Sequence, residues 1–174
     1  KIKPIKEVVN FYGPQRFSET NAHVGKLLVQ KEFKDACSIL HLVAEGNDYI
    51  GALRKHGVPK LKLYVSAYQS LLWNTLAAKS KKNMLPILGY LTEGKEYNAL
   101  MKKEGIRKED FLIRSMPEIS SEGGKREHII LVKNFKTLAY TDDELHPGKK
   151  KQIIHFLLPK GAYATIVLEN LLRK

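Results

Sequence analysis

The chain has 174 residues, which at roughly 150 residues per domain allows one domain with a smaller insertion and excludes two large domains. Thirty Lys and Arg against 18 Asp and Glu give a net charge of +12, while 43% hydrophobic residues exclude a disordered basic tail. This charge predicts a polyanionic partner. Nucleic acid is favoured over a membrane, because no run approaches the roughly 18 apolar residues of a spanning helix.

The first third of the chain combines an aromatic loop with helical patterns. An extended apolar stretch over 1–9 leads into a loop over 10–17, which Gly13 and Pro14 break. Helical spacing predicts two helices between residues 20 and 43, with Cys37 as a buried thiol. A single cysteine that cannot form an internal disulfide fits a reducing, intracellular compartment, so we expect a cytoplasmic protein.

The middle of the chain predicts one long helix and then shorter elements. Residues 46–60 are rich in Gly and basic side chains and lead into a helix over 61–79. Its expected buried stripe is Leu61, Val65, Tyr68, Leu72, Leu76 and Lys79, widened by Tyr64, Leu71 and Thr75. A short apolar stretch, a helix from Thr92 to Gly105, a helix over 108–114 and a long loop over 115–127 follow.

The last third of the chain predicts a sheet and a closing helix. Strands are expected over 128–135 and 150–158, joined by a turn over 142–148. A C-terminal helix after Gly161 should pack on the sheet, with Tyr163, Ile166, Val167, Leu171 and Leu172 on its buried face. Helices and strands that do not alternate regularly indicate an α+β fold.

Several catalytic classes lack their motifs. The six histidines are scattered and pair with no other His or Cys at zinc-ligand spacing, so we expect no metal site. The sequence contains no phosphate-binding glycine loop, no dinucleotide fingerprint and no nucleophile elbow. We therefore expect no cofactor, and any catalysis falls to carboxylate, aromatic or amide groups.

The loop over 10–17 combines groups that recognise nucleobases. Its members are Asn10, Phe11, Tyr12, Gly13, Pro14, Gln15, Arg16 and Phe17. A ring can stack an extruded base, amides can read the edge of the base, and arginine can bind phosphate. Alternatively, Phe11 and Phe17 are core anchors and Arg16 is an ordinary surface charge; composition and spacing alone leave both readings open.

The chain resembles the TruD family of tRNA pseudouridine synthases. NFYGPQRFS at 10–18 is similar to the family signature N-Y-F-G-x-Q-R-F-G. Asn21, Gly25 and Lys26 resemble its N-x-x-x-G-K step, and SAYQSLLWN at 66–74 resembles its A-Y-Q-S-x-L-F-N helix. Gly124 to Arg126 resemble the G-x-R before an insertion-domain strand, and 156–172 resemble the closing F-x-L-P-x-G-S-Y-A-T-x-x-L-R-E-L-L.

The resemblance implies roles for the loop residues. Asn10 would be an active-site amide near the catalytic aspartate, and Tyr12, where the family more often has Phe, would stack the target uracil. Phe11, Gln15, Arg16 and Phe17 would complete the substrate-binding loop. Ser18 replaces the usual Gly, which puts the local backbone angle in question because Gly tolerates positive φ and Ser does not.

One family motif has no counterpart in the chain. The family carries its catalytic aspartate in G-x-K-D-x-x-A-x-T-x-Q upstream of this loop, and only nine residues precede Asn10. Lys34 and Asp35 repeat the dipeptide inside a predicted helix without the flanking residues, so Asp35 is interpreted as a solvated helix residue. The chain therefore resembles the C-terminal part of the enzyme, and we expect the aspartate upstream.

The resemblance also implies a substrate and a domain plan. The fold would be part of a synthase catalytic domain over 1–81 and 141–174, with a mixed or antiparallel sheet and flanking helices, plus a reduced insertion domain over 82–140. The substrate would be a uridine in tRNA. Exposed cations would contact the RNA backbone, namely Arg54, Lys55, Lys60, Lys62, Arg126, Lys149, Lys150 and Lys151.

Alternatives to an active synthase remain open at this point. The chain begins at Lys1 and not at Met, so it could be the ordered or expressed portion of a longer synthase. It could instead be one half of a split enzyme that needs a partner with the aspartate, or a catalytically inactive RNA-binding module. A generic basic RNA-binding domain would leave the ordered motif matches as coincidence.

Overall fold

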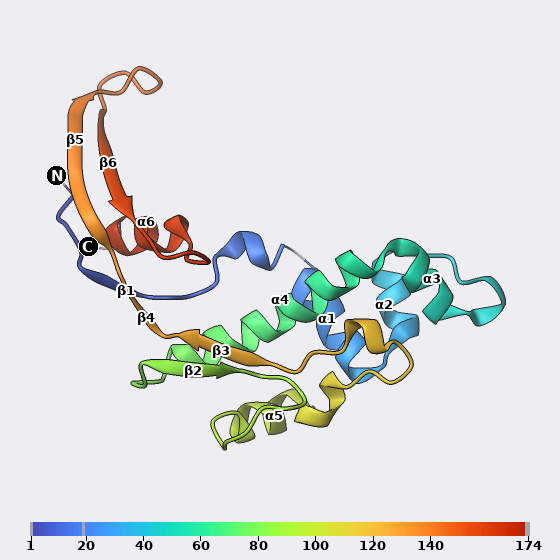
Figure 1. Cartoon of the computed structure of the whole chain (residues 1–174). Coiled ribbons are helices and arrows are strands. Elements are labelled where there is room, and N and C mark those ends of the chain that lie inside the picture. The colour runs from blue at the N-terminus through green and yellow to red at the C-terminus, as the bar shows by residue number, and fades with distance from the viewer. Residues whose placement is uncertain (1, 19, 173–174) are drawn as a thin grey trace. The chain divides into compact units, whose positions relative to one another are not determined.

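The computed structural model describes residues 2–18 and 20–172, and the chain divides into two compact units (Figure 1). Unit 1 combines residues 1–13 with 127–174, and unit 2 is the continuous segment 14–126. Helices and small antiparallel sheets are mixed without regular alternation, which confirms the α+β expectation. The predicted domain ranges begin at residue 1 and end at residue 174, and both positions lie outside the described residues.

Unit 1 is built from two antiparallel strand pairs and one helix. Its elements are β1 (Glu7–Val9), β4 (Ile129–Leu131), β5 (Lys133–Asp142), β6 (Lys150–Leu157) and α6 (Ala164–Leu172). β1 pairs with β4, with Val8 opposite Ile130, and β5 pairs with β6 as a long hairpin. Val8 and Ile130 pack with Val167 and Leu171 of α6 in one apolar cluster, so α6 covers the strands as predicted.

The first part of unit 2 is a helical layer. Its elements are η1 (Pro14–Arg16), α1 (Asn21–Gln30), α2 (Phe33–Ile39), η2 (Glu45–Asn47), α3 (Tyr49–His56) and α4 (Val58–Ala77). α4 is the longest helix and buries Leu61, Val65, Tyr68 and Leu72 in the main core. Its backbone approaches α1 closely at Gly25, where an added Cβ would lie 2.0 Å from the carbonyl oxygen of Tyr64.

The second part of unit 2 packs short elements against α4. Its elements are β2 (Met84–Ile87), α5 (Asn98–Glu104), η3 (Lys108–Phe111), η4 (Pro117–Ile119) and β3 (Gly124–Glu127). β2 and β3 form a two-stranded sheet. The buried amide of Gln69 donates to the carbonyl of Leu88 and, at 2.8 Å, to the hydroxyl of Ser121. This one side chain of α4 therefore holds two segments that lie 33 residues apart in sequence.

Several predicted elements are confirmed. The helix pair after residue 20, the long helix, the second hairpin strand, the 142–148 turn and the C-terminal helix all form, and Cys37 is 2% exposed.

Other predictions need correction. α3 was not predicted, and the predicted loop over 115–127 contains a 3-10 turn and strand β3. The predicted strand over 128–135 is two strands, of which β5 extends to Asp142. The predicted helix from Thr92 begins only at Asn98, although Gly105 ends it as expected with a left-handed φ of 66°.

Two predicted helix faces are also corrected. On α4, Leu71 is 43% exposed and Thr75 is exposed, and Lys79 lies beyond the helix in solvent. On α6, Leu172 is 75% exposed. Ile166, Val167 and Leu171 are buried as predicted, so Leu172 is the residue of this helix that departs from the predicted buried face.

Two further expectations concern membrane-spanning helices and the range of the insertion domain. In residues 2–18 and 20–172, no helix combines the length and apolar character that crossing a membrane requires. The assignment of 82–140 as an insertion domain stays a prediction, because the division into compact units follows contacts and not family domains.

Candidate functional site

Asn10 is fixed in unit 1 by the chain that enters β4. Its backbone N–H donates to the carbonyl of His128 at 2.8 Å, and its side-chain Nδ2 donates to the carbonyl of Glu127 at 3.0 Å. Asn10 is 6% exposed and His128 is 3% exposed. Both contacts use backbone acceptors, so the chain that enters β4 orients the amide of Asn10.

Tyr12 lies two residues further along and meets a second aromatic ring. Its ring is half-buried and contacts Tyr163 edge to face, with centroids 6.2 Å apart and an interplanar angle of 62°. Tyr163 precedes α6, and sequence reasoning placed it on the buried face of that helix and not at the site. The sequence feature that marks Tyr163 is an aromatic residue directly after Gly161 and Ala162 in the closing motif. Phe11, which lies between Asn10 and Tyr12 in the loop, is also half-buried.

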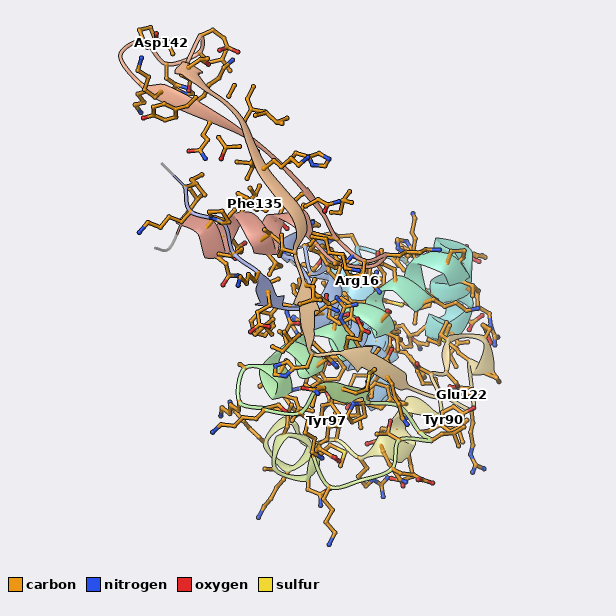
Figure 2. All side chains as sticks on the ribbon, turned by 60° about the vertical axis from the view of Figure 1, so that its left-hand side comes forward. Arg16, Tyr90, Tyr97, Glu122, Phe135 and Asp142 are labelled. Atoms are coloured by element: carbon orange, nitrogen blue, oxygen red, sulfur yellow. The ribbon has the colours of Figure 1, made fainter. Side chains whose placement is uncertain are left out.

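The second half of the predicted loop belongs to unit 2. Gln15 is exposed on η1, and Arg16 and Phe17 are half-buried. Arg16 lies against α4, where its guanidinium donates to the hydroxyl of Ser66 (Figure 2). The interpretation of Arg16 as a freely solvated charge is therefore wrong. Ser66 is a positioning partner that sequence reasoning missed, although it opens the matched SAYQS motif.

The backbone angle at Ser18, where the family usually has Gly, is now defined. Its φ is 48°, in the left-handed region that Gly occupies without strain. The loop therefore keeps the conformation that a glycine would favour, and Ser18 adopts it at a local energetic cost.

The predicted RNA-contact residues of α3 and α4 differ in their surroundings. Lys55, Lys60 and Lys62 are exposed. Arg54 is held by Glu118, with Nε to Oε1 at 2.7 Å, and by the carbonyl of Ser115 at 3.0 Å. The hydrogen bond from Arg54 holds the pKa of Glu118 below its ordinary value. Arg54 therefore carries much less uncompensated charge than its three neighbours.

The remaining predicted contacts lie on β3 and the hairpin. Arg126 places its guanidinium 5.4 Å from the ring centroid of the buried Trp73, a cation–π geometry. At the hairpin tip, which Figure 2 marks by Asp142, Lys150 pairs with that carboxylate at 2.5 Å and Lys151 pairs with Glu144. These pairings compensate part of the positive charge that the sequence suggested.

The aspartates of the chain occupy structural positions. Asp35 is exposed on α2, as predicted, and Asp48 caps α3 by accepting from the Gly51 N–H at 2.8 Å. Asp110 pairs with Lys31, and Asp142 and Asp143 lie in the hairpin tip. No group of three or more His, Cys, Asp or Glu side chains able to hold a metal occurs among the described residues.

The fold has a counterpart among solved structures. A crystal structure of the Methanosarcina mazei protein assigned as tRNA pseudouridine synthase D superposes with a TM-score of 0.78 at 23% identity. The match covers 96% of this chain and 61% of that one. The chain therefore shares the fold of that structure.

Sequence comparison identifies the family. The model described as tRNA pseudouridine synthase D (TruD) matches residues 79–171, and the chain belongs to this family. A relative from Methanosarcina mazei, named a "probable tRNA pseudouridine synthase D", is 45% identical over 65 residues, which are 37% of this chain and 14% of the relative. A relative of the same name from Methanopyrus kandleri is 31% identical over 156 residues, covering 76% of this chain and 37% of the relative.

Proposed function

We propose that the chain supplies the base-stacking loop and an RNA-binding surface of a TruD-type synthase that converts uridine to pseudouridine in tRNA. The observation that carries the proposal is that one short loop places a fixed amide, Asn10, two residues before the half-buried ring of Tyr12. The aligned regions cover only 14% and 37% of the two relatives described above, so the activity of the whole enzyme is part of the proposal.

The aromatic pair suits the holding of a detached base. Stacking of one base on an aromatic ring contributes about 1–3 kcal/mol, comparable to the cost of extruding the base. The edge-to-face contact with Tyr163 restricts how the Tyr12 ring can turn. A ring fixed in this way offers one face to uracil at little further entropic cost.

The reaction requires this holding step. The bond between ribose C1′ and uracil N1 breaks, the base turns, and C1′ bonds to C5. The C5 proton is lost and N1 gains a proton, so the reaction consumes no cofactor and no redox equivalent. Tyr12 would keep the uracil in place during the turn, and Asn10 would orient the group that starts the reaction.

The initiating carboxylate is the missing part of the proposed mechanism. Asp48 is committed to a helix cap, Asp110 to Lys31, and Asp142 to Lys150, and Asp35 is solvated. We therefore expect the catalytic aspartate from a segment outside these 174 residues, either in the same polypeptide or in a partner chain.

The proposal is tested with tRNA that carries tritium at C5 of uridine, since turnover releases that hydrogen. The chain alone is expected to bind tRNA and release no tritium, and addition of the N-terminal segment of the Methanosarcina mazei relative should permit release. In that complemented system Tyr12→Phe should stay active and Tyr12→Ala should lose turnover while keeping most RNA affinity. Tyr140→Ala, an exposed tyrosine of the hairpin in unit 1, is the matched control.

Each outcome bears on a separate part of the proposal. Full tritium release by the chain alone would overturn the proposal that the catalytic aspartate lies outside these 174 residues. Unchanged turnover of Tyr12→Ala would overturn the stacking role. Tight RNA binding without turnover under every complementation would favour an inactive RNA-binding module.

A further inference from the structure

A 44-residue stretch of unit 2 lacks acidic side chains entirely. Residues 49–92 contain seven Lys and Arg and no Asp or Glu. At the average density of 18 carboxylates in 174 residues, about four or five would be expected there. The stretch contains α3 and α4 in full, so the bias belongs to folded helices and not to a disordered tail.

The cations of this stretch gather near the two ends of α4. The start cluster is Lys55, Lys60 and Lys62, and the end cluster is Lys79 and Lys81; all five side chains are exposed. Figure 1 shows α4 running between α3 and β2 within unit 2. Nineteen residues separate Lys60 from Lys79, which at 1.5 Å per residue is about 28 Å.

Most of these lysines lack a compensating carboxylate. Arg54 and Lys82, which flank the clusters, pair with Glu118 and Glu96. Within the described part of the chain, none of the five cluster lysines forms an ion pair. Lys62 contributes to the lowered pKa of Glu118 without pairing with it, and the other four cluster lysines present their charge to solvent without a paired carboxylate.

The start cluster also opposes the helix dipole. Lys60 and Lys62 lie in the first turns of α4, which contain no acidic residue. The N-terminus of a helix carries partial positive charge and favours carboxylates, so lysines there are unfavourable for the fold. Departures from a local stability rule are typical of functional positions.

We propose that α4 spans two phosphodiester segments of one folded RNA, with the start cluster on one segment and the end cluster on the other. This inference rests on the proposed function and adds a property of the substrate, namely two backbone segments held about 28 Å apart. A folded RNA presents such a separation in advance, whereas an unstructured strand must be ordered at an entropic cost. Two linked contacts then raise affinity above that of either cluster alone.

The test measures binding of the full chain to folded tRNA and to polyuridine of equal length over a salt series. Lys60→Gln/Lys62→Gln and Lys79→Gln/Lys81→Gln each remove two charges, and Lys102→Gln/Lys103→Gln on α5 is the control of equal charge. Each cluster variant should flatten the plot of log K against log[salt] for tRNA by about 1.8, from 0.9 per lost phosphate contact. The variant that combines all four substitutions should lower the salt slope by the sum of the two decreases. It should still bind tRNA at a ratio of 1:1.

Preference for tRNA over polyuridine should fall in each of the two cluster variants and persist in the control. Thermal unfolding separates lost contacts from misfolding, since Lys60→Gln/Lys62→Gln should be at least as stable as wild type. If wild type binds tRNA but either cluster variant keeps the full salt slope or the full preference, the inference is overturned and the proposed function stands. If wild type binds tRNA no better than the combined variant, the RNA-binding part of the proposed function fails as well.

Discussion

Replacement of Gly25 by alanine should destabilise unit 2, because α1 and α4 touch through backbone at this point. A Cβ on residue 25 would lie 2.0 Å from the carbonyl oxygen of Tyr64 and 2.9 Å from the Cβ of Tyr68. Carbon atoms of this kind do not approach other heavy atoms within 3.0 Å, so one helix must move by about 1 Å. The obstacle is the backbone of a 20-residue helix, which cannot rotate away as a side chain could.

The magnitude follows from two opposing effects. Overpacking of a well-packed core costs about 1–3 kcal/mol, and a rigid backbone contact lies at the upper end of that range. Alanine is a better helix former than glycine by about 1 kcal/mol, which offsets part of the cost. The expected net loss is about 2 kcal/mol, which corresponds to a fall in Tm of about 4–8 °C for a chain of this size.

Thermal and urea unfolding of wild type, Gly25→Ala and Gly124→Ala measure the effect. Gly124 has no heavy atom within 4 Å of an added Cβ, so its alanine variant isolates the backbone entropy that any Gly→Ala change alters. The reasoning is refuted if Gly25→Ala unfolds at or above the wild-type temperature while Gly124→Ala behaves as wild type.

Three further predictions concern other positions. Ser18→Gly should raise stability by about 1 kcal/mol, because the φ of 48° strains a non-glycine residue; equal stability of Ser18→Gly and Ser18→Ala in unfolding experiments would contradict this. Gln69→Leu should cost about 1–3 kcal/mol, because the buried carbonyl of Leu88 and the half-buried hydroxyl of Ser121 lose a donor; Ser121→Ala, which removes one partner only, should cost less. Burial and the nearby Lys60 lower the pKa of His56 below 6.5, so the unfolded state binds this proton first and stability should fall as pH drops through 6.5. His56→Gln should lose that part of the pH dependence, and identical pH profiles would disprove the assignment.

Sequence patterns predicted the elements whose burial follows a simple period. α4 repeats apolar residues at helical spacing over five turns, and β6 and α6 show equally plain patterns. α3 was missed because its apolar face is short: only Ala52 and Leu53 are buried, Tyr49 and Ile50 pack partly against the core, and Asp48 caps its first turn. β3 reads Gly-Lys-Arg-Glu and is held by backbone pairing, so it has no alternation to detect.

The candidate site was only partly predictable for a similar reason. Asn10 and Tyr12 are neighbours in one loop, and a short motif can identify them together. The contact between Tyr12 and Tyr163 joins residues 151 positions apart, and no local pattern encodes it. The structural roles of Arg54 and Lys150 likewise depend on carboxylates that the fold brings to them.

The discontinuity of unit 1 has a consequence for biosynthesis. Val9 of β1 pairs with Ile129 of β4, so β1 has no partner until 120 further residues have been made. At 5–20 residues per second this delay is about 6–24 s, long enough for the contiguous unit 2 to fold first. During that interval β1 lacks its β4 partner, and Asn10 lacks the backbone acceptors at Glu127 and His128. The backbone around Asn10 therefore takes its final form late, only after β4 has left the ribosome.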